Sequence, residues 1–464
     1  MPPPRCDLPR RCISVLTAQE SVISELIESS PASNDDADVP DRESPVEDRV
    51  PAAASKNFIV LMLYQVVLRV GWIFKTESVI MPAVLDFLGG SGMLRGLLPP
   101  INRVCQSLPA LLMAGQMQMA PRKKSWLCVC TVLMAICFAL LAVGFYLLDS
   151  HPVTLQVFFI AIYAIFFVAT GMTQVLFHTL QGKLIPVGDR GRLLLVTNVV
   201  GVTAAVGAVW ICMPAWVAAE GVEFHWLFAT SSIAFFVAAA IAWCVDEPAV
   251  ISEAPEAVQG IRARYAEAVL PFRDDPNFRR LAIAAALFGS TIMLFPHYQS
   301  LGRGGLLGGD FRSLMLWLIV QNLGTAAFSM VVGPLADRRG NRIALRLGLI
   351  GVTAAPLLAI GLVWTEIAWA FPIVFVLVGL TPVLLRLFMN YTLEVAPTDK
   401  HPSYLAAISV ATGLPVLCSP VVGMMIDRVG FSPVFVAISL CGVAAWWISG
   451  RLEEPRCSQS NRKR

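Results

Sequence analysis

The sequence predicts an all-α, polytopic integral membrane protein whose twelve transmembrane helices form two pseudo-symmetric six-helix bundles. Composition, a ladder of apolar runs and an internal repeat lead to this fold class. Of the 464 residues, 56% are hydrophobic and only 14% are charged, and the mean hydropathy is +0.68. Water-soluble domains carry about 25% charged residues. The composition therefore excludes a soluble enzyme, a coiled coil and a wholly disordered chain.

Polar segments flank the apolar part of the chain and divide it in two. Residues 1–55 are rich in acids, Ser and Pro and contain no aromatic residue, which predicts a disordered acidic tail. Residues 451–464 form a second polar tail. Residues 246–278 hold the longest internal polar stretch, so we expect a linker there. The bundles then cover residues 56–245 and 279–450.

Twelve apolar runs lie between the tails. A membrane-spanning helix needs about 20 mostly apolar residues, and each run is long enough. Charges, Gly or Pro interrupt the first and seventh runs. The expected spans are 57–87, 93–118, 125–148, 153–180, 193–217, 225–244, 279–301, 311–334, 342–364, 367–390, 403–425 and 432–450.

Basic residues are distributed unevenly between the two sides. If the N-terminus lies inside, the inner loops and the linker carry sixteen Lys or Arg residues. The outer loops carry four, namely Arg95, Arg303, Arg312 and Arg428. Because short loops rich in Lys and Arg stay inside, we expect both termini in the cytoplasm and the helices in the plasma (inner) membrane.

The two halves of the chain repeat each other. Residues 171–178, GMTQVLFH, align with residues 379–386, GLTPVLLR, at a shift of 208. Pro186 aligns with Pro397 at a shift of 211, and Phe58 with Phe278 at 220. Six-helix halves around a site at mid-membrane are a common plan for secondary transporters.

The loop after the eighth span, residues 333–342, reads GPLADRRGNR. It resembles the signature loop of the major facilitator superfamily, Gly-x-Leu-Ala-Asp-Arg-x-Gly-Arg-Arg, at seven of the eight positions that the pattern specifies. The loop at residues 186–192 is also similar to that family's inner-loop pattern. The resemblance implies the two-bundle fold and alternating-access transport. It also implies an inner gate built from Gly333, Asp337, Arg338, Gly340 and Arg342, with Arg190 and Arg192.

Two departures from the family pattern affect the gate. In the first-half copy, residues 115–124, Met119 stands where the family has Asp. We therefore expect the inner gate to depend on Asp337, whose carboxylate suits a helix N-terminus. A third loop of similar sequence contains Asp427 and Arg428 but falls on the outer side, and we interpret it as a turn.

Charges within the spans indicate the site, because a charge at mid-membrane costs about 2.5–3.5 kcal/mol on insertion scales. In the first span, Gln65, Arg69, Trp72 and Thr76 share one helix face. The resemblance implies that spans 1, 4, 7 and 10 line the cavity, and these carry Arg69, His178, His297 and Arg386. The candidate substrate site comprises Gln65, Arg69, Trp72, Arg103, Gln174, His297, Tyr298, Arg386 and Asn390. The candidate proton-coupling groups are Glu77, His178 and His297.

The polar groups outside the first span also have structural explanations. His178 would lie in the inner headgroup region, and His297 would cap a helix break at the preceding proline. Arg386 would pair with Glu394 or with backbone carbonyls. Arg103 would bind a glutamate of the first span or a loop carbonyl. In that first span, a tilted or broken helix would place Lys75 and Glu77 at the outer interface.

The inventory of buried charges is mainly cationic, and paired guanidinium groups bind carboxylate or phosphate. The sequence therefore predicts a secondary transporter for a small polar or anionic solute, with possible proton or ion coupling, acting as a monomer. The alternatives are a drug exporter and a non-transporting membrane sensor. No HExxH or GxSxG motif is present, so we expect neither an enzyme nor a metal or cofactor site. The low net charge of +3 gives no indication of nucleic-acid binding.

Overall fold

The computed structural model describes residues 49–107, 121–147, 151–218, 221–248, 272–273, 275–397 and 400–453. Residues 51–464 form one unit by their contacts, and the fold below is that of this unit. Most of the expected acidic tail, most of the linker, most of the C-terminal tail and Met119 lie outside the described residues.

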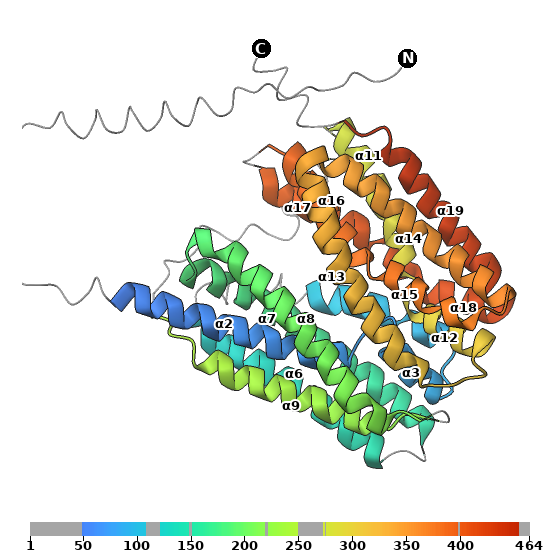
Figure 1. The fold of residues 1–464 in the computed structure, drawn as a ribbon, viewed down its shortest axis with the longest axis horizontal. Coiled ribbons are helices and arrows are strands. Elements are labelled where there is room, and N and C mark those ends of the chain that lie inside the picture. The colour runs from blue at the N-terminus through green and yellow to red at the C-terminus, as the bar shows by residue number, and fades with distance from the viewer. Residues whose placement is uncertain are drawn as a thin grey trace, which may run out of the picture. The chain divides into compact units, whose positions relative to one another are not determined.

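Helices make up nearly all of the described chain (Figure 1). In the first half they are α2 (Arg49–Ile73), α3 (Ile80–Phe87), α4 (Gly92–Gly96), α6 (Lys123–Leu147), α7 (Pro152–Leu184), α8 (Val187–Trp216) and α9 (Phe224–Trp243). In the second half they are α11 (Pro276–Ile292), α12 (Phe295–Leu306), α13 (Ser313–Arg339), α14 (Asn341–Trp364), α15 (Pro372–Val378), α16 (Thr381–Val395), α17 (His401–Gly413), α18 (Ser419–Val429) and α19 (Phe431–Ser449). Two short 3₁₀ helices, η1 (Ala368–Ala370) and η3 (Pro415–Cys418), join some of them.

The described part contains eleven helical segments long and apolar enough to cross a membrane. They correspond to eleven of the twelve expected spans. The remaining span, expected at 93–118, begins with α4 and continues as helix to residue 107, where the described residues stop. The structure is therefore a multi-pass helical membrane protein of the predicted class.

Several spans are broken at mid-length. Residues 74–79 separate α2 from α3, and residues 293–294 separate α11 from α12. These are the two runs that charges, Gly or Pro interrupt in the sequence. The spans expected as continuous over 367–390 and 403–425 are also broken, at Gly379 and at Leu414. A proline follows each of these breaks and cannot donate the backbone hydrogen bond that would continue the preceding helix.

The same clasp joins the start and the end of each half. Asn57 Oδ1 accepts from the N–H of Asp246 at 2.8 Å, and its Nδ2 donates to the Asp246 carbonyl at 2.9 Å. Asn277 Oδ1 accepts from the N–H of Glu453 at 3.0 Å. Asn57 and Asn277 directly precede the two phenylalanines that align in the sequence, so the repeat is also present in the structure. We call the side of the molecule that carries these clasps the terminal side, and the opposite side the far side.

A second repeated feature is a close helix crossing. A Cβ atom on Gly171 would collide with the backbone carbonyl oxygen of Gln106. A Cβ atom on Gly379, the residue aligned with Gly171, would collide with the carbonyl oxygen of Gln321. In each half the glycine of the fourth span thus lets the second span approach its backbone closely.

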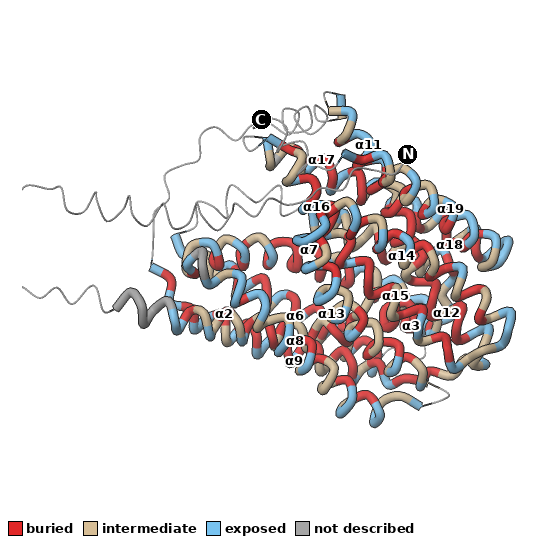
Figure 2. Tube along the Cα trace, turned by 45° about the horizontal axis from the view of Figure 1, so that its top comes forward, coloured by how far each residue is buried: buried red, intermediate tan, exposed pale blue. Residues whose placement is uncertain are grey.

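Exposed residues lie along the outward faces of the helices (Figure 2). Many of these exposed residues are large and apolar. Ile211, Met330 and Leu440 are among those that are mostly exposed, while aromatic side chains such as Phe138 and Phe166 fill the interior. A helix that is apolar on both its inner and outer faces is typical of a membrane span. The outer surface is therefore suited to lipid.

Candidate functional site

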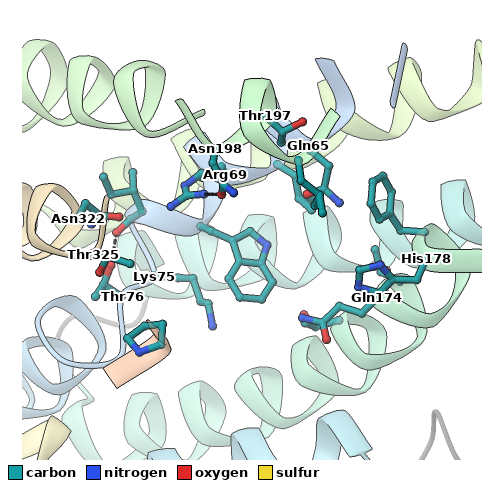
Figure 3. Close-up of a pocket in the computed structure, with 18 of the residues that line it drawn as sticks. Gln65, Arg69, Lys75, Thr76, Gln174, His178, Thr197, Asn198, Asn322 and Thr325 are labelled. Carbon is teal, nitrogen blue, oxygen red and sulfur yellow. Dashed lines mark hydrogen bonds between the residues drawn. The ribbon is translucent and has the colours of Figure 1, made fainter. Parts of the chain in front are cut away.

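A cavity of about 590 Å³ lies between the two halves (Figure 3). The first half supplies most of its wall, from α2, α7, α8 and the break after α2. The second half contributes Gln321, Asn322 and Thr325 of α13 and Pro382 and Arg386 of α16. The lining extends from the α2–α3 break to Gln181 and Leu193, which lie near the terminal-side ends of α7 and α8.

Two arginines, one from each half, line this cavity. Arg69 Nη1 donates to Asn198 Oδ1 at 2.9 Å, and the Arg69 stem packs against Gly201 of α8. Arg386 lies close enough for its positive charge to act on that of Arg69. Within the described part of the chain, no ion pair joins either arginine to a carboxylate. The alternative pairing of Arg386 with Glu394 is thus not formed. The cavity therefore presents uncompensated positive charge.

The break between α2 and α3 brings an ion pair to the cavity wall. Lys75 Nζ lies 3.0 Å from Glu77 Oε1, and Asn102 Nδ2 lies 2.6 Å from both Glu77 oxygens. Lys75 is only 2% exposed. The broken-helix alternative for this span was correct about the break. It was wrong to place Lys75 and Glu77 at the outer interface, because both line the cavity.

Most of the predicted site residues come together here. Gln65, Arg69, Trp72, Glu77, Gln174, His178 and Arg386 all line the cavity. Sequence analysis did not identify Lys75, Thr197, Asn198 or Thr325 as site residues. The signal for Asn198 and Thr325 was present, since each is a polar residue within an apolar span.

Four predicted site residues are not among those that line the cavity. Arg103 lies within electrostatic range of Glu77. Tyr298 is buried against the Phe435 ring at 5.3 Å between centroids. Asn390 is exposed. His297 is fully buried, near Arg95, and neither ring nitrogen has a hydrogen-bond partner among the described residues. The seventh span therefore contributes no lining residue to this cavity.

Polar contacts close the far side between the halves. Asp86 of α3 accepts hydrogen bonds from Gln299 at 2.6 Å and Ser300 at 2.8 Å, both on α12. Arg95 donates to the same carboxylate, and Arg303 Nη1 lies 3.7 Å from it. Arg95 and Arg303, expected in outer loops, thus lie in helices and take part in this closure.

Asp427 forms the second part of the closure. Its Oδ1 accepts from the Gly92 N–H at 2.9 Å and its Oδ2 from the Met93 N–H at 3.3 Å. Glycines make the contact possible, since a Cβ on Gly423 would collide with the Gly92 carbonyl oxygen. The interpretation of Asp427 as part of a turn was wrong. It lies in the last turn of α18 and binds the start of α4 across the two halves.

The signature loop lies on the terminal side. Gly340, between α13 and α14, has a φ of 90°, a backbone conformation that favours glycine. Gly333 lies inside α13, and nothing lies within 4 Å of a Cβ placed on it. Asp337, Arg338 and Arg192 are exposed. Arg342 donates to the Gly450 carbonyl at 2.6 Å, and Arg190 to the Gly182 carbonyl at 2.6 Å.

Within the described residues, no group of three or more His, Cys, Asp or Glu side chains is arranged to hold a metal ion.

Comparisons with known proteins agree with this architecture. The family model described as Major Facilitator Superfamily matches residues 304–464. A crystal structure of a mutant of the nucleoside transporter NupG has a TM-score of 0.67 at 11% identity, covering 86% of this chain and 99% of that one. A bacterial homologue of the human lysosomal transporter Spinster, in an inward-facing and unoccupied conformation, gives 0.57 at 12% identity, covering 86% and 98%. No curated protein sequence matches the chain.

These findings rest on different parts of the molecule. The family model covers the signature loop and the helices around it, whereas the structural matches extend over both halves. Residues 304–464 thus resemble the Major Facilitator Superfamily, and the described chain has the fold of the solved structures of NupG and of the bacterial Spinster homologue.

Proposed function

We propose that the protein moves a small organic anion through this cavity by alternating access. The observation that carries the proposal is the presence of Arg69 and Arg386 in one cavity with no carboxylate paired to either in the described part of the chain. Two like charges that lie close together repel each other. An anion between them removes that repulsion, and a carboxylate or phosphate matches the planar fork of each guanidinium.

The arginines lie on opposite halves, which links binding to movement. A solute held by both would contact α2 in the first half and α16 in the second. Rocking of the halves around a fixed site then carries the solute from one side to the other. Gln65, Gln174, Thr197, Asn322 and Thr325 supply hydrogen-bonding groups around the solute, and Trp72 supplies an apolar surface.

We propose that Glu77 and His178 couple transport to proton movement. Both are titratable groups that line the cavity, together with its arginine and lysine side chains. Glu77 adjoins the helix break, and His178 lies on α7, where its ring contacts Phe177 at 5.7 Å between centroids. Both groups are within the space that a solute would enter. Uptake into proteoliposomes under an imposed pH gradient tests this: Glu77→Gln and His178→Gln should reduce gradient-driven accumulation more than exchange.

The orientation proposed from the loop charges places both termini in the cytoplasm of a plasma-membrane protein. The far side, closed by Asp86 and Asp427, is then external, and the cavity reaches the cytoplasmic side. In the opposite state we propose that the signature loop around Asp337 closes the terminal side. Protease protection of epitope tags at the two termini in sealed cells tests the orientation, and light scattering of the purified protein tests the expected monomer.

The substrate proposal is tested by thermal-shift titration of the purified protein with a panel of organic anions. A ligand at 100 times its Kd stabilises by about 2.7 kcal/mol. The stabilising anion should lose its effect in Arg69→Gln and Arg386→Gln, and Lys at either position should restore it only in part, because an ammonium lacks the planar fork. Arg312→Gln, an exposed arginine outside the cavity, is the matched control. Anion-dependent stabilisation and flux unchanged in both variants would contradict the proposal, and a preference for uncharged compounds would favour a drug exporter.

A further inference from the structure

The Lys75 ammonium lies inside a cage of aromatic rings. Its Nζ is 4.1 Å from the centroid of the Phe167 ring, 4.3 Å from that of Trp72 and 5.4 Å from that of Phe166. On another side it lies 3.0 Å from the Glu77 carboxylate. Rings that present their faces to a cation, with a carboxylate beside them, form the kind of site that binds alkylammonium ligands. Figure 3 shows Lys75 at the wall of the cavity.

The walls of this cage are held by groups other than Lys75. Phe166 and Phe167 are buried on α7, and the Phe166 ring packs against the Phe138 ring at 4.9 Å between centroids. Asn102 donates to both oxygens of Glu77, so the carboxylate is oriented from the second span. The cage is therefore a built site into which Lys75 extends.

The origin of Lys75 in the α2–α3 break explains how it reaches the cage. The Thr76 hydroxyl donates to the Ile73 carbonyl at 2.7 Å, and the Ile80 N–H donates to the Thr76 carbonyl at 2.9 Å. These bonds stabilise a turn in place of continuous helix. The residue before Thr76 is thereby directed into the cage.

We propose that this cage is a binding site for a primary alkylammonium group, and that Lys75 fills it from within and so excludes cationic solutes from the cavity. With Lys75 in place, the ion pair satisfies Glu77, and the charge left open in the cavity is that of Arg69 and Arg386. Without Lys75, the carboxylate and the rings would accept an external ammonium. The role in solute selection rests on the proposed anion transport, whereas the cage itself does not.

The experiment uses methylammonium, which reproduces the end of the lysine side chain, as a probe of the purified full-length protein. Lys75→Ala empties the cage, and Lys75→Ser is a second truncation. Thermal-shift titration should show saturable stabilisation of both variants by methylammonium, with an apparent Kd about tenfold or more below that of the unaltered protein. Sodium chloride at equal ionic strength and methanol, which lacks the charge, should have no such effect.

Further variants assign the binding to the cage. Adding Glu77→Gln or Phe167→Leu to Lys75→Ala should abolish the methylammonium effect, whereas adding Arg312→Gln should leave it unchanged. If the truncated variants are too unstable to purify, the measurement is the yield of folded protein after expression and solubilisation with and without methylammonium. Methylammonium should raise that yield. No stabilisation and no recovery in either truncation would overturn the inference. Arg69→Gln and Arg386→Gln test anion transport separately, so the two proposals can fail independently.

Discussion

The carboxylate of Asp427, at the end of α18, accepts the backbone N–H of Gly92, at the start of α4, at 2.9 Å across the two halves. Residues 335 positions apart in the chain thus help to close the far side through a charge-assisted hydrogen bond to backbone. A bond of this type forms only while the halves are together on that side. We therefore expect it to bias the equilibrium between the two open states.

Asp427→Asn should shift the protein toward opening of the far side. The change removes the negative charge that two backbone N–H groups and Arg95 share. Hydrogen bonds to charged groups contribute about 1.5–3 kcal/mol, so the ratio of far-side-closed to far-side-open protein should fall about tenfold or more. Spin-label distances between positions 151 and 365, which lie on the far-side ends of α7 and α14, measure the change. Asp310→Asn is the control. It alters a hydrogen bond to the Arg312 N–H in the loop between α12 and α13 and should leave the distance distribution unchanged.

Gly423→Ala should have a similar effect for a steric reason. A Cβ at this position would meet backbone atoms of Gly92 and Met93, which cannot move aside without separating α4 from α18. Gly207→Ala in α8 is the control, because nothing lies within 4 Å of a Cβ there. The same distance measurement should show far-side opening in the first variant only. An unchanged closed distance in Gly423→Ala would mean that this crossing does not hold the halves together.

Asp86→Asn should lower the stability of the protein. Asp86 faces Arg95 and Arg303, whose side chains are 12% and 9% exposed. Removing one partner leaves these cations nearly buried without compensation, and breaking such a network costs about 3 kcal/mol. The melting temperature in detergent measures the loss. Asp189→Asn, which alters an exposed carboxylate in the first turn of α8, is the comparison, and it should lower the melting temperature less.

Asp337→Asn should instead act on the terminal side. If the signature loop closes that side, the variant should disfavour the closed state and reduce transport while the protein still binds its solute. Labels on the terminal-side ends of α2 and α16 report closure. Unchanged transport together with unchanged terminal-side accessibility would remove Asp337 from the gate.

Asn57→Ala and Asn277→Ala should each destabilise their own half. Asn57 is 3% exposed and makes two backbone hydrogen bonds, so its loss should cost about 1–3 kcal/mol. Asn277 is only half-buried, and its loss should cost less. Amide hydrogen exchange, resolved by peptide, should show faster exchange near the altered clasp alone. Ser409→Ala, at an exposed position of α17, is the control.

The fold was predictable because lipid imposes a simple pattern. Every spanning helix must satisfy its own backbone and present apolar side chains, so span number and type follow from hydropathy. The breaks at Gly379 and Leu414 were not predicted, although each has a proline nearby. A run can remain apolar across a break, and only the neighbouring helices determine whether the backbone bends there.

The site was predictable in part for a related reason. Arg69 and Arg386 could be identified because a charge within a span has few places to lie other than a cavity. His297 meets the same criterion, yet it is sealed into the far side near Arg95. Its position depends on the direction that α12 takes after the break at residues 293–294. The spacing of polar residues along the chain does not predict that direction. Lys75 was left out of the candidate site, because the spacing of residues along the chain does not show that a lysine side chain will pack among aromatic rings.

The paired clasps of Asn57 and Asn277 have a consequence for the proposed rocking of the two halves. Each clasp joins the first span of its half by hydrogen bonds to the residues that follow the sixth span of that half. Both clasps lie on the terminal side. A half that tilts must then carry its own ends with it as a rigid body. The change in contacts during such a tilt is thus confined to the interface between the halves, because the clasps keep the terminal turns of each half folded.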